Sequence, residues 1–83
     1  MIESRIKEYR RRITDEMYIS AYYILISEID KSGISNEIIE LSKELSGEVR
    51  GKAYSYSYKK NDKLAHELDA LLKLVIKING EGI

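Results

Sequence analysis

Asp62, His66 and Asp69 are the polar residues whose types and spacing come nearest to a reactive site. On a helix these spacings place them within about 60° of one another, and a histidine between two carboxylates suits a metal or acid–base site. No second histidine or matching carboxylate helix completes it, and no phosphate loop, nucleophile motif or glycine fingerprint occurs. The simpler interpretation is a helix cap, a surface histidine and one acid of an ion pair. We therefore predict no enzyme, no catalytic residue, no metal and no cofactor.

Basic residues and tyrosines form a second candidate site. Positions 5–12 hold five basic residues and one acid, and so do positions 50–63. Such residues contact phosphates, and tyrosine rings stack on bases. The candidate nucleic-acid contacts are Arg10, Arg11, Arg12, Arg50, Lys52, Tyr54, Tyr58, Lys59, Lys60 and Lys63. One alternative is a solvated helix surface with the tyrosines partly in the core, because net charge is zero and three adjacent arginines point in different directions. Another is a surface for an acidic protein.

An uncharged stretch from Met17 to Ser27 supplies the third candidate. A helix that is apolar all round is buried or spans a membrane, and this stretch is shorter than the roughly 20 residues that a span requires. Its second apolar face must be covered by another helix of the chain or by another chain. The candidate protein-interface residues are Tyr18, Ile19, Tyr22, Tyr23, Ile26, Ile29, Leu72 and Ile76.

The elements that carry these residues are predicted to be three helices in an antiparallel all-α bundle. Neither glycine nor proline interrupts residues 2–30, which indicates one long helix. A second helix at about 36–59 follows Gly33, with Ser35 as its N-cap. Gly47 and Gly51 leave a break at 46–51 open, although we favour continuity because no turn residues flank them. A third helix at about 63–79 follows an Asn61 or Asp62 cap, and 80–83 form a loose tail.

This arrangement predicts that the two basic stretches meet. The second helix would return beside the first and bring 54–60 close to 9–12. Residues 1–83 are expected to form a single helical domain.

Composition sets the remaining expectations. A chain of 83 residues buries only about 60% of its unfolded surface, and it has no cysteine for a disulfide, so a partner chain is the remaining stabilising device. The Lys and Glu bias is typical of thermophiles, although an AT-rich genome also favours Lys. Because no signal peptide is visible, we expect a cytoplasmic protein without a membrane segment.

These features predict a non-enzymatic helical interaction protein, either self-associating as a homo-oligomer or acting as a small accessory subunit of a larger complex. The alternative function is a small nucleic-acid-binding or nucleoprotein-associated factor that uses the basic, tyrosine-bearing end.

Overall fold

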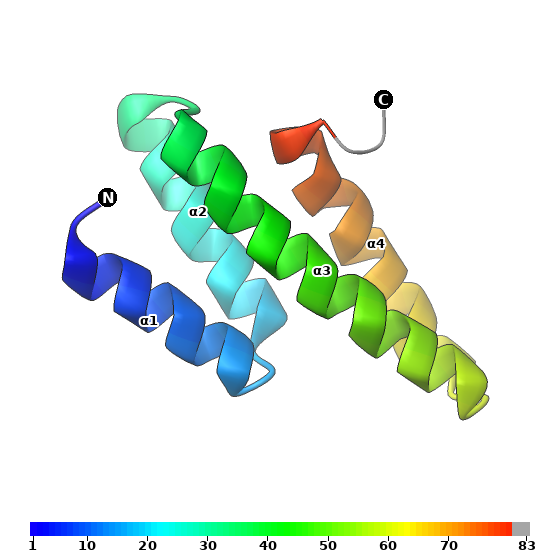
Figure 1. The fold of residues 1–83 in the computed structure, drawn as a ribbon. Helices are drawn as coiled ribbons and strands as arrows, with labels where there is room; N and C mark the ends of the chain where they lie inside the picture. The colour runs from blue at the N-terminus through cyan, green and yellow to red at the C-terminus, as the bar shows by residue number, and fades with distance from the viewer. Residues whose placement is uncertain (81–83) are drawn as a thin grey trace.

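The computed structural model describes residues 1–80, which form four α-helices and no strand (Figure 1). The prediction of an all-α protein is confirmed. The prediction of three helices is wrong, because the stretch 2–30 is divided in two. Apart from Gly80, which ends the last helix, the predicted tail at 80–83 lies outside the described residues. The helices are α1 (Glu3–Thr14), α2 (Tyr18–Ser32), α3 (Asn36–Tyr58) and α4 (Asp62–Asn79).

The break between α1 and α2 is a left-handed turn at Glu16. Its φ is 62°, and Asp15 before it is the C-cap of α1. The N–H of Met17 donates to the carbonyl of Arg12 at 2.8 Å, and the N–H of Glu16 donates to that of Ile13 at 3.0 Å. This pair of bonds is the Schellman motif, which satisfies the last carbonyls of a helix. The chain therefore reverses direction without glycine or proline.

The same device ends α3. Lys60 has φ 62° and follows the C-cap Lys59. The N–H of Asn61 donates to the carbonyl of Tyr56 at 2.8 Å, and the N–H of Lys60 donates to that of Ser57 at 3.0 Å. Asn61 then caps α4 by accepting from a backbone N–H of its first turn. The third predicted helix, at about 63–79, is confirmed as α4.

The second predicted helix is also confirmed, and it continues through Gly47 and Gly51. The Ser35 side chain caps its start by accepting from the N–H of Ile38 at 3.2 Å. Apart from the adjacent residues and backbone of α3 itself, no described atom lies within 4 Å of where a Cβ would stand on either helical glycine, so neither marks a close helix crossing.

Successive helices run antiparallel, so that α1 and α3 share one direction (Figure 1). In this view α1 and α4 lie on opposite sides of α3, and α4 packs along much of its length. The core draws on all four helices, and its fully buried side chains include Tyr9, Leu25, Leu45, Val49 and Val75. The long α3 is thus the element on which the other helices are placed.

Polar contacts fix how α1 lies along α3. The buried hydroxyl of Tyr9 donates to the Leu41 carbonyl at 2.5 Å, and the Arg10 guanidinium holds Glu44 at 3.0 and 3.1 Å. The prediction that 54–60 meets 9–12 is therefore wrong. Because the chain reverses at Glu16, Tyr9 lies beside the first half of α3, and the end of α3 extends beyond α1 (Figure 1). Among residues 1–80, no helix is long and apolar enough to cross a membrane.

Replacing Lys60 with glycine should stabilise the protein. A left-handed conformation costs an L-residue about 1–2 kcal/mol, whereas glycine adopts it freely and loses about 0.5–1 kcal/mol through its more flexible unfolded chain. The expected gain in the free energy of unfolding is about 0.5–1 kcal/mol, measured by urea denaturation. The matched control is Lys59→Gly, whose φ of −78° needs no relief, and it should lower stability. Equal effects of the two changes would contradict this account of the turn.

Tyr9→Phe should remove the bond to Leu41 and lower the free energy of unfolding by about 1 kcal/mol at neutral pH. Burial, helped by the Glu44 carboxylate, raises the pKa of Tyr9 above its ordinary value of 10.0. The pKa of Tyr9 is higher in the folded than in the unfolded state, so the stabilisation by its protonated hydroxyl is complete below pH 10. This stabilisation is lost as pH rises from there towards the folded-state pKa. Wild type should thus lose more stability than Tyr9→Phe between pH 9 and 11 (roughly the onset of this window). The exposed Tyr58→Phe is the control and should change neither quantity.

Candidate functional site

The second apolar face of the stretch 17–29 is only partly covered in the structure. Tyr18 is buried, and Tyr22, Ile26 and Ile29 are half-buried. Ile19 and Tyr23, one turn apart on α2, keep 60% and 63% of their surface exposed. Most of the face predicted to need a partner is therefore absorbed by the fold, and these last two residues remain.

Leucines of α4 extend this surface. Ile19 and Tyr18 line a hollow of about 170 Å³ together with Leu64 and Leu68 of α4. Leu71 and Glu67 also line this hollow, and Leu74, three residues after Leu71 and seven after Glu67 on α4, is 44% exposed. We define the α2–α4 apolar face as Ile19, Tyr23, Leu64, Leu68 and Leu74. The α4 leucines of this face were not among the predicted interface residues, because leucines at helical spacing usually belong to the core.

The two α4 residues of the predicted interface do not belong to this face. Leu72 and Ile76 are half-buried, as Leu64 and Leu68 are, but they lie on another side of α4. Helical spacing places them on the side of Ala65 and Asp69, which faces a different hollow beside α3. The predicted set of eight residues is therefore not one surface.

The arginines of the predicted nucleic-acid site are occupied within the fold. Arg10 pairs with Glu44, as described above. Arg11 contacts Glu8 and Asp15, and Arg12 contacts Glu8 and donates to the Ser20 carbonyl of α2 at 3.1 Å. Hydrogen bonds from Arg11, and next from Arg12, lower the pKa of Glu8 from 4.5 to about 2. Arg10 and Arg12 therefore connect α1 to α3 and α2, and the three arginines do not form one basic stripe.

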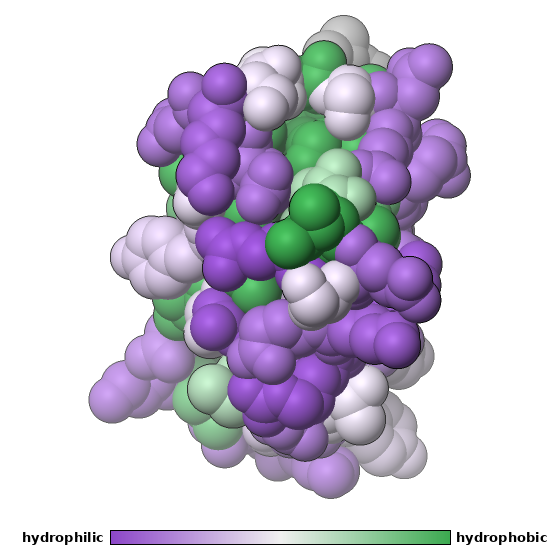
Figure 2. All heavy atoms as spheres, turned by 90° about the vertical axis from the view of Figure 1, so that its left-hand side faces the viewer, coloured by the Kyte–Doolittle hydropathy of each residue, from purple (hydrophilic) through white to green (hydrophobic). Residues whose placement is uncertain are grey.

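Figure 2 views the molecule from the side of α1. Hydrophilic side chains cover most of this surface, and hydrophobic ones emerge only between them. This distribution agrees with the ion pairs along α1. It also leaves this side without a broad apolar face.

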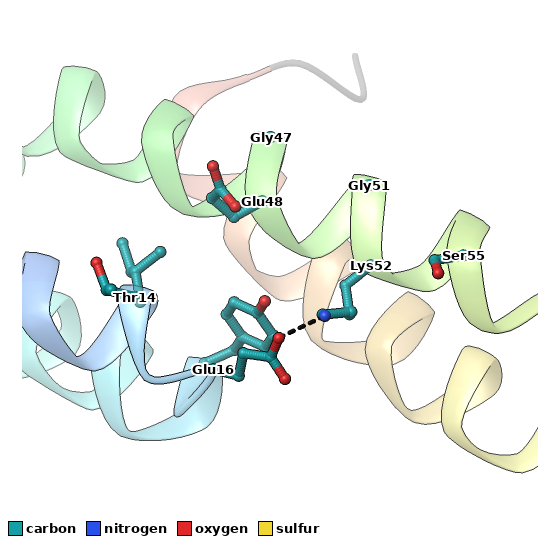
Figure 3. Close-up of a pocket in the computed structure, with 9 residues that line it drawn as sticks. Thr14, Glu16, Gly47, Glu48, Gly51, Lys52 and Ser55 are labelled. Atoms are coloured by element: carbon teal, nitrogen blue, oxygen red, sulfur yellow. Dashed lines mark hydrogen bonds and ion pairs between the residues drawn. The ribbon is translucent and has the colours of Figure 1, made fainter.

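Lys52 is occupied as well. Its ammonium contacts the carboxylate of Glu16, which raises the pKa of Lys52, and it lies 6.0 Å from the centre of the Tyr56 ring. The Glu16–Lys52 pair spans a hollow of about 640 Å³ whose walls also carry Thr14 and Glu48, as Figure 3 shows. Gly47, Gly51 and Ser55 line its α3 side. The left-handed turn thus also positions an acid against α3.

The remaining members of the basic set lie towards the far end of α3 and the turn into α4. Tyr54 and Tyr58 are 75% and 82% exposed. Arg50 is also exposed, one turn before Tyr54. The lysines of this region are exposed too, and no described residue forms an ion pair with them: Lys59, Lys60 and Lys63.

Asp62, His66 and Asp69 line a hollow of about 340 Å³ between the second half of α3 and the start of α4. All three are exposed, and residues 1–80 contain no group of three or more His, Asp or Glu side chains arranged to hold a metal ion. The side chains therefore share one side of a helix, as their spacing predicts, without converging on a common point.

Comparisons with known proteins identify no relative. No protein family matches this sequence, and no curated protein or solved structure resembles it significantly. The function is accordingly argued from the surfaces themselves.

Proposed function

We propose that this chain is a non-enzymatic helical interaction protein that associates with a second copy of itself through the α2–α4 apolar face. The observation that carries the proposal is the exposure of Ile19 and Tyr23, at 60% and 63%, one turn apart on α2. Large apolar side chains that lie together on a surface are typical of protein interfaces, and tyrosine is a preferred interface residue.

The charges beside this face favour a second copy as the occupant. Exposed Glu67 and Lys77 lie on either side of Leu74 and Ala70 along α4. When two copies of α4 pair antiparallel about a two-fold axis, Glu67 of each copy faces Lys77 of the other, and Leu74 faces Ala70. Such self-complementarity is what a two-fold interface requires. The alternative occupant is a different protein, for which the chain would serve as an accessory subunit.

The energetics favour a reversible complex. Removing an aliphatic side chain from water contributes about 1.5–3 kcal/mol, and a tyrosine buries a comparable or larger area. A two-fold interface buries each residue twice, so Ile19, Tyr23 and Leu74 contribute six side chains. The cost of lost rotational and translational freedom offsets much of this gain. We therefore expect dimerisation in the micromolar range.

Sedimentation velocity over about 1–100 µM protein tests the proposal. Wild type should shift from monomer to dimer across this range, whereas Ile19→Lys and Tyr23→Lys should remain monomeric because a buried unpaired charge is costly. The control is Ile2→Lys, since Ile2 is 72% exposed at the start of α1, away from this face.

Two outcomes would contradict the proposal. A dimer that persists in both lysine variants would assign self-association to another surface. A wild-type chain that stays monomeric throughout would exclude the second copy. The accessory-subunit alternative would then require a partner from the native source whose binding both lysine variants weaken and Ile2→Lys does not.

A further inference from the structure

A second exposed surface lies at the opposite end of α3 from its N-cap. We call it the Tyr–Lys corner and define it as Tyr54, Tyr58, Lys59, Lys60 and Lys63. Its tyrosines are the two most exposed large hydrophobic side chains among the described residues, at 75% and 82%. Neither ring contributes to the core. Their contribution to stability is therefore small, and both rings are accessible to a ligand.

The two rings share one side of α3. Residues four apart on a helix are neighbours, with Cβ atoms about 5–6 Å apart. The intervening Tyr56 points elsewhere, towards α2 and α4, where it lines a hollow with Ile19 and meets Lys52. Serines separate the three tyrosines of the run 54–58, and only the first and third tyrosines form this exposed pair of rings.

The charge of the corner differs from that of the other basic stretch. The arginines of α1 are paired with four acids, which are Glu8, Asp15, Glu28 and Glu44. The three corner lysines have no such partner among the described residues. The left-handed turn at Lys60 places one of them on the reversal itself, between the other two in sequence.

Acidic groups limit how an anion could approach. Asp62, His66 and Asp69 line the α4 side of the hollow beside Tyr54, and Arg50 lines its α3 side. The two carboxylates repel phosphates there. A nucleic-acid backbone would therefore lie along the lysines of the turn and outside the hollow.

We propose that the Tyr–Lys corner binds single-stranded nucleic acid, with Tyr54 and Tyr58 stacking on unpaired bases and the lysines contacting phosphates. Aromatic platforms beside positive charge are the usual means of holding single strands without reading their sequence. Protruding rings have no base face to stack on in an intact duplex. An acidic protein would use the charges but would gain little from two stacked rings, so the single strand fits this corner better. The proposal is independent of the α2–α4 apolar face.

Fluorescence anisotropy with a labelled oligothymidylate of about 20 nucleotides, at about 50 mM salt, tests the inference. Tyr54→Ala and Tyr58→Ala should each weaken binding about tenfold or more, whereas Tyr54→Phe and Tyr58→Phe should retain it because the ring remains. Circular dichroism should show unchanged folding, since both side chains lie in solvent.

The contribution of the lysines to binding can be measured separately, from how the affinity depends on salt concentration. Contacts from three lysines predict a slope of log affinity against log salt of about −2 for a single strand. The double change Lys59→Ser with Lys63→Ser should bring this slope to about −0.7. The control changes the exposed Lys31 and Lys73 to serine, away from the corner, and should leave both affinity and slope unchanged.

The proposal is overturned if no binding occurs at low salt, if duplex DNA binds as tightly as the single strand, or if the alanine variants bind like wild type. If the control lysine variant loses as much affinity for the oligonucleotide as the corner lysine variant, binding is general electrostatic attraction. That result would also overturn the proposal. An acidic polymer such as polyglutamate that competes as well as the oligonucleotide would indicate an acidic protein partner instead.

Discussion

The left-handed turn at Glu16 is the constraint on which the rest of the molecule depends. A continuous helix over 2–30 would carry Tyr9 and Tyr23 along one rod, far apart. The reversal instead folds α2 back beside α1 and leaves both to pack on α3. The conformation costs about 1–2 kcal/mol for a residue other than glycine. Two Schellman hydrogen bonds and the contact of Glu16 with Lys52 offset that cost.

Electrostatic pairing explains how a chain of zero net charge still presents a positive corner. The acids near α1, on α1 itself and on the first half of α3, neutralise its arginines. The end of α3 extends beyond these acids, so its lysines are left to solvent or to a ligand. Surface pairs of this kind contribute little stability individually. Their larger effect is that some basic side chains are paired with carboxylates, whereas others remain available to bind an anion.

The limits of prediction from the sequence follow from where its signals lie. The caps Ser35 and Asn61 use side chains, so local composition reveals where α3 and α4 begin. The α1–α2 reversal uses only backbone bonds, with Glu16 at the left-handed position, so no glycine or proline marks it. Composition and spacing made Tyr54 and Tyr58 candidate contacts, but their exposure is known only from the structure. The pairing of Arg10 with Glu44 depends on two helices meeting, which no local pattern encodes.

The apolar surfaces likewise combine a feature that the sequence predicts with one that depends on how the helices pack. The sequence indicated that α2 and α4 carry more apolar area than a simple stripe needs. It could not specify which side chains the fold covers, since that depends on the α2–α3–α4 arrangement. The structure buries Tyr18 and leaves Ile19 exposed, although they are neighbours in the chain.

The order of the helices has a consequence for how quickly the protein can fold. The main packed pairs are α1 with α2, α2 with α3 and α3 with α4, each joined by a short turn. Contacts between segments that are close in sequence need little loop closure before they form, and folding rates rise as such contacts come to dominate. The α3–α4 hairpin is the most extensive of these pairs, and α1, at 12 residues, is too short to be stable alone. Folding on the microsecond-to-millisecond scale is expected from this topology, with α1 docking after α3 and α4 have paired.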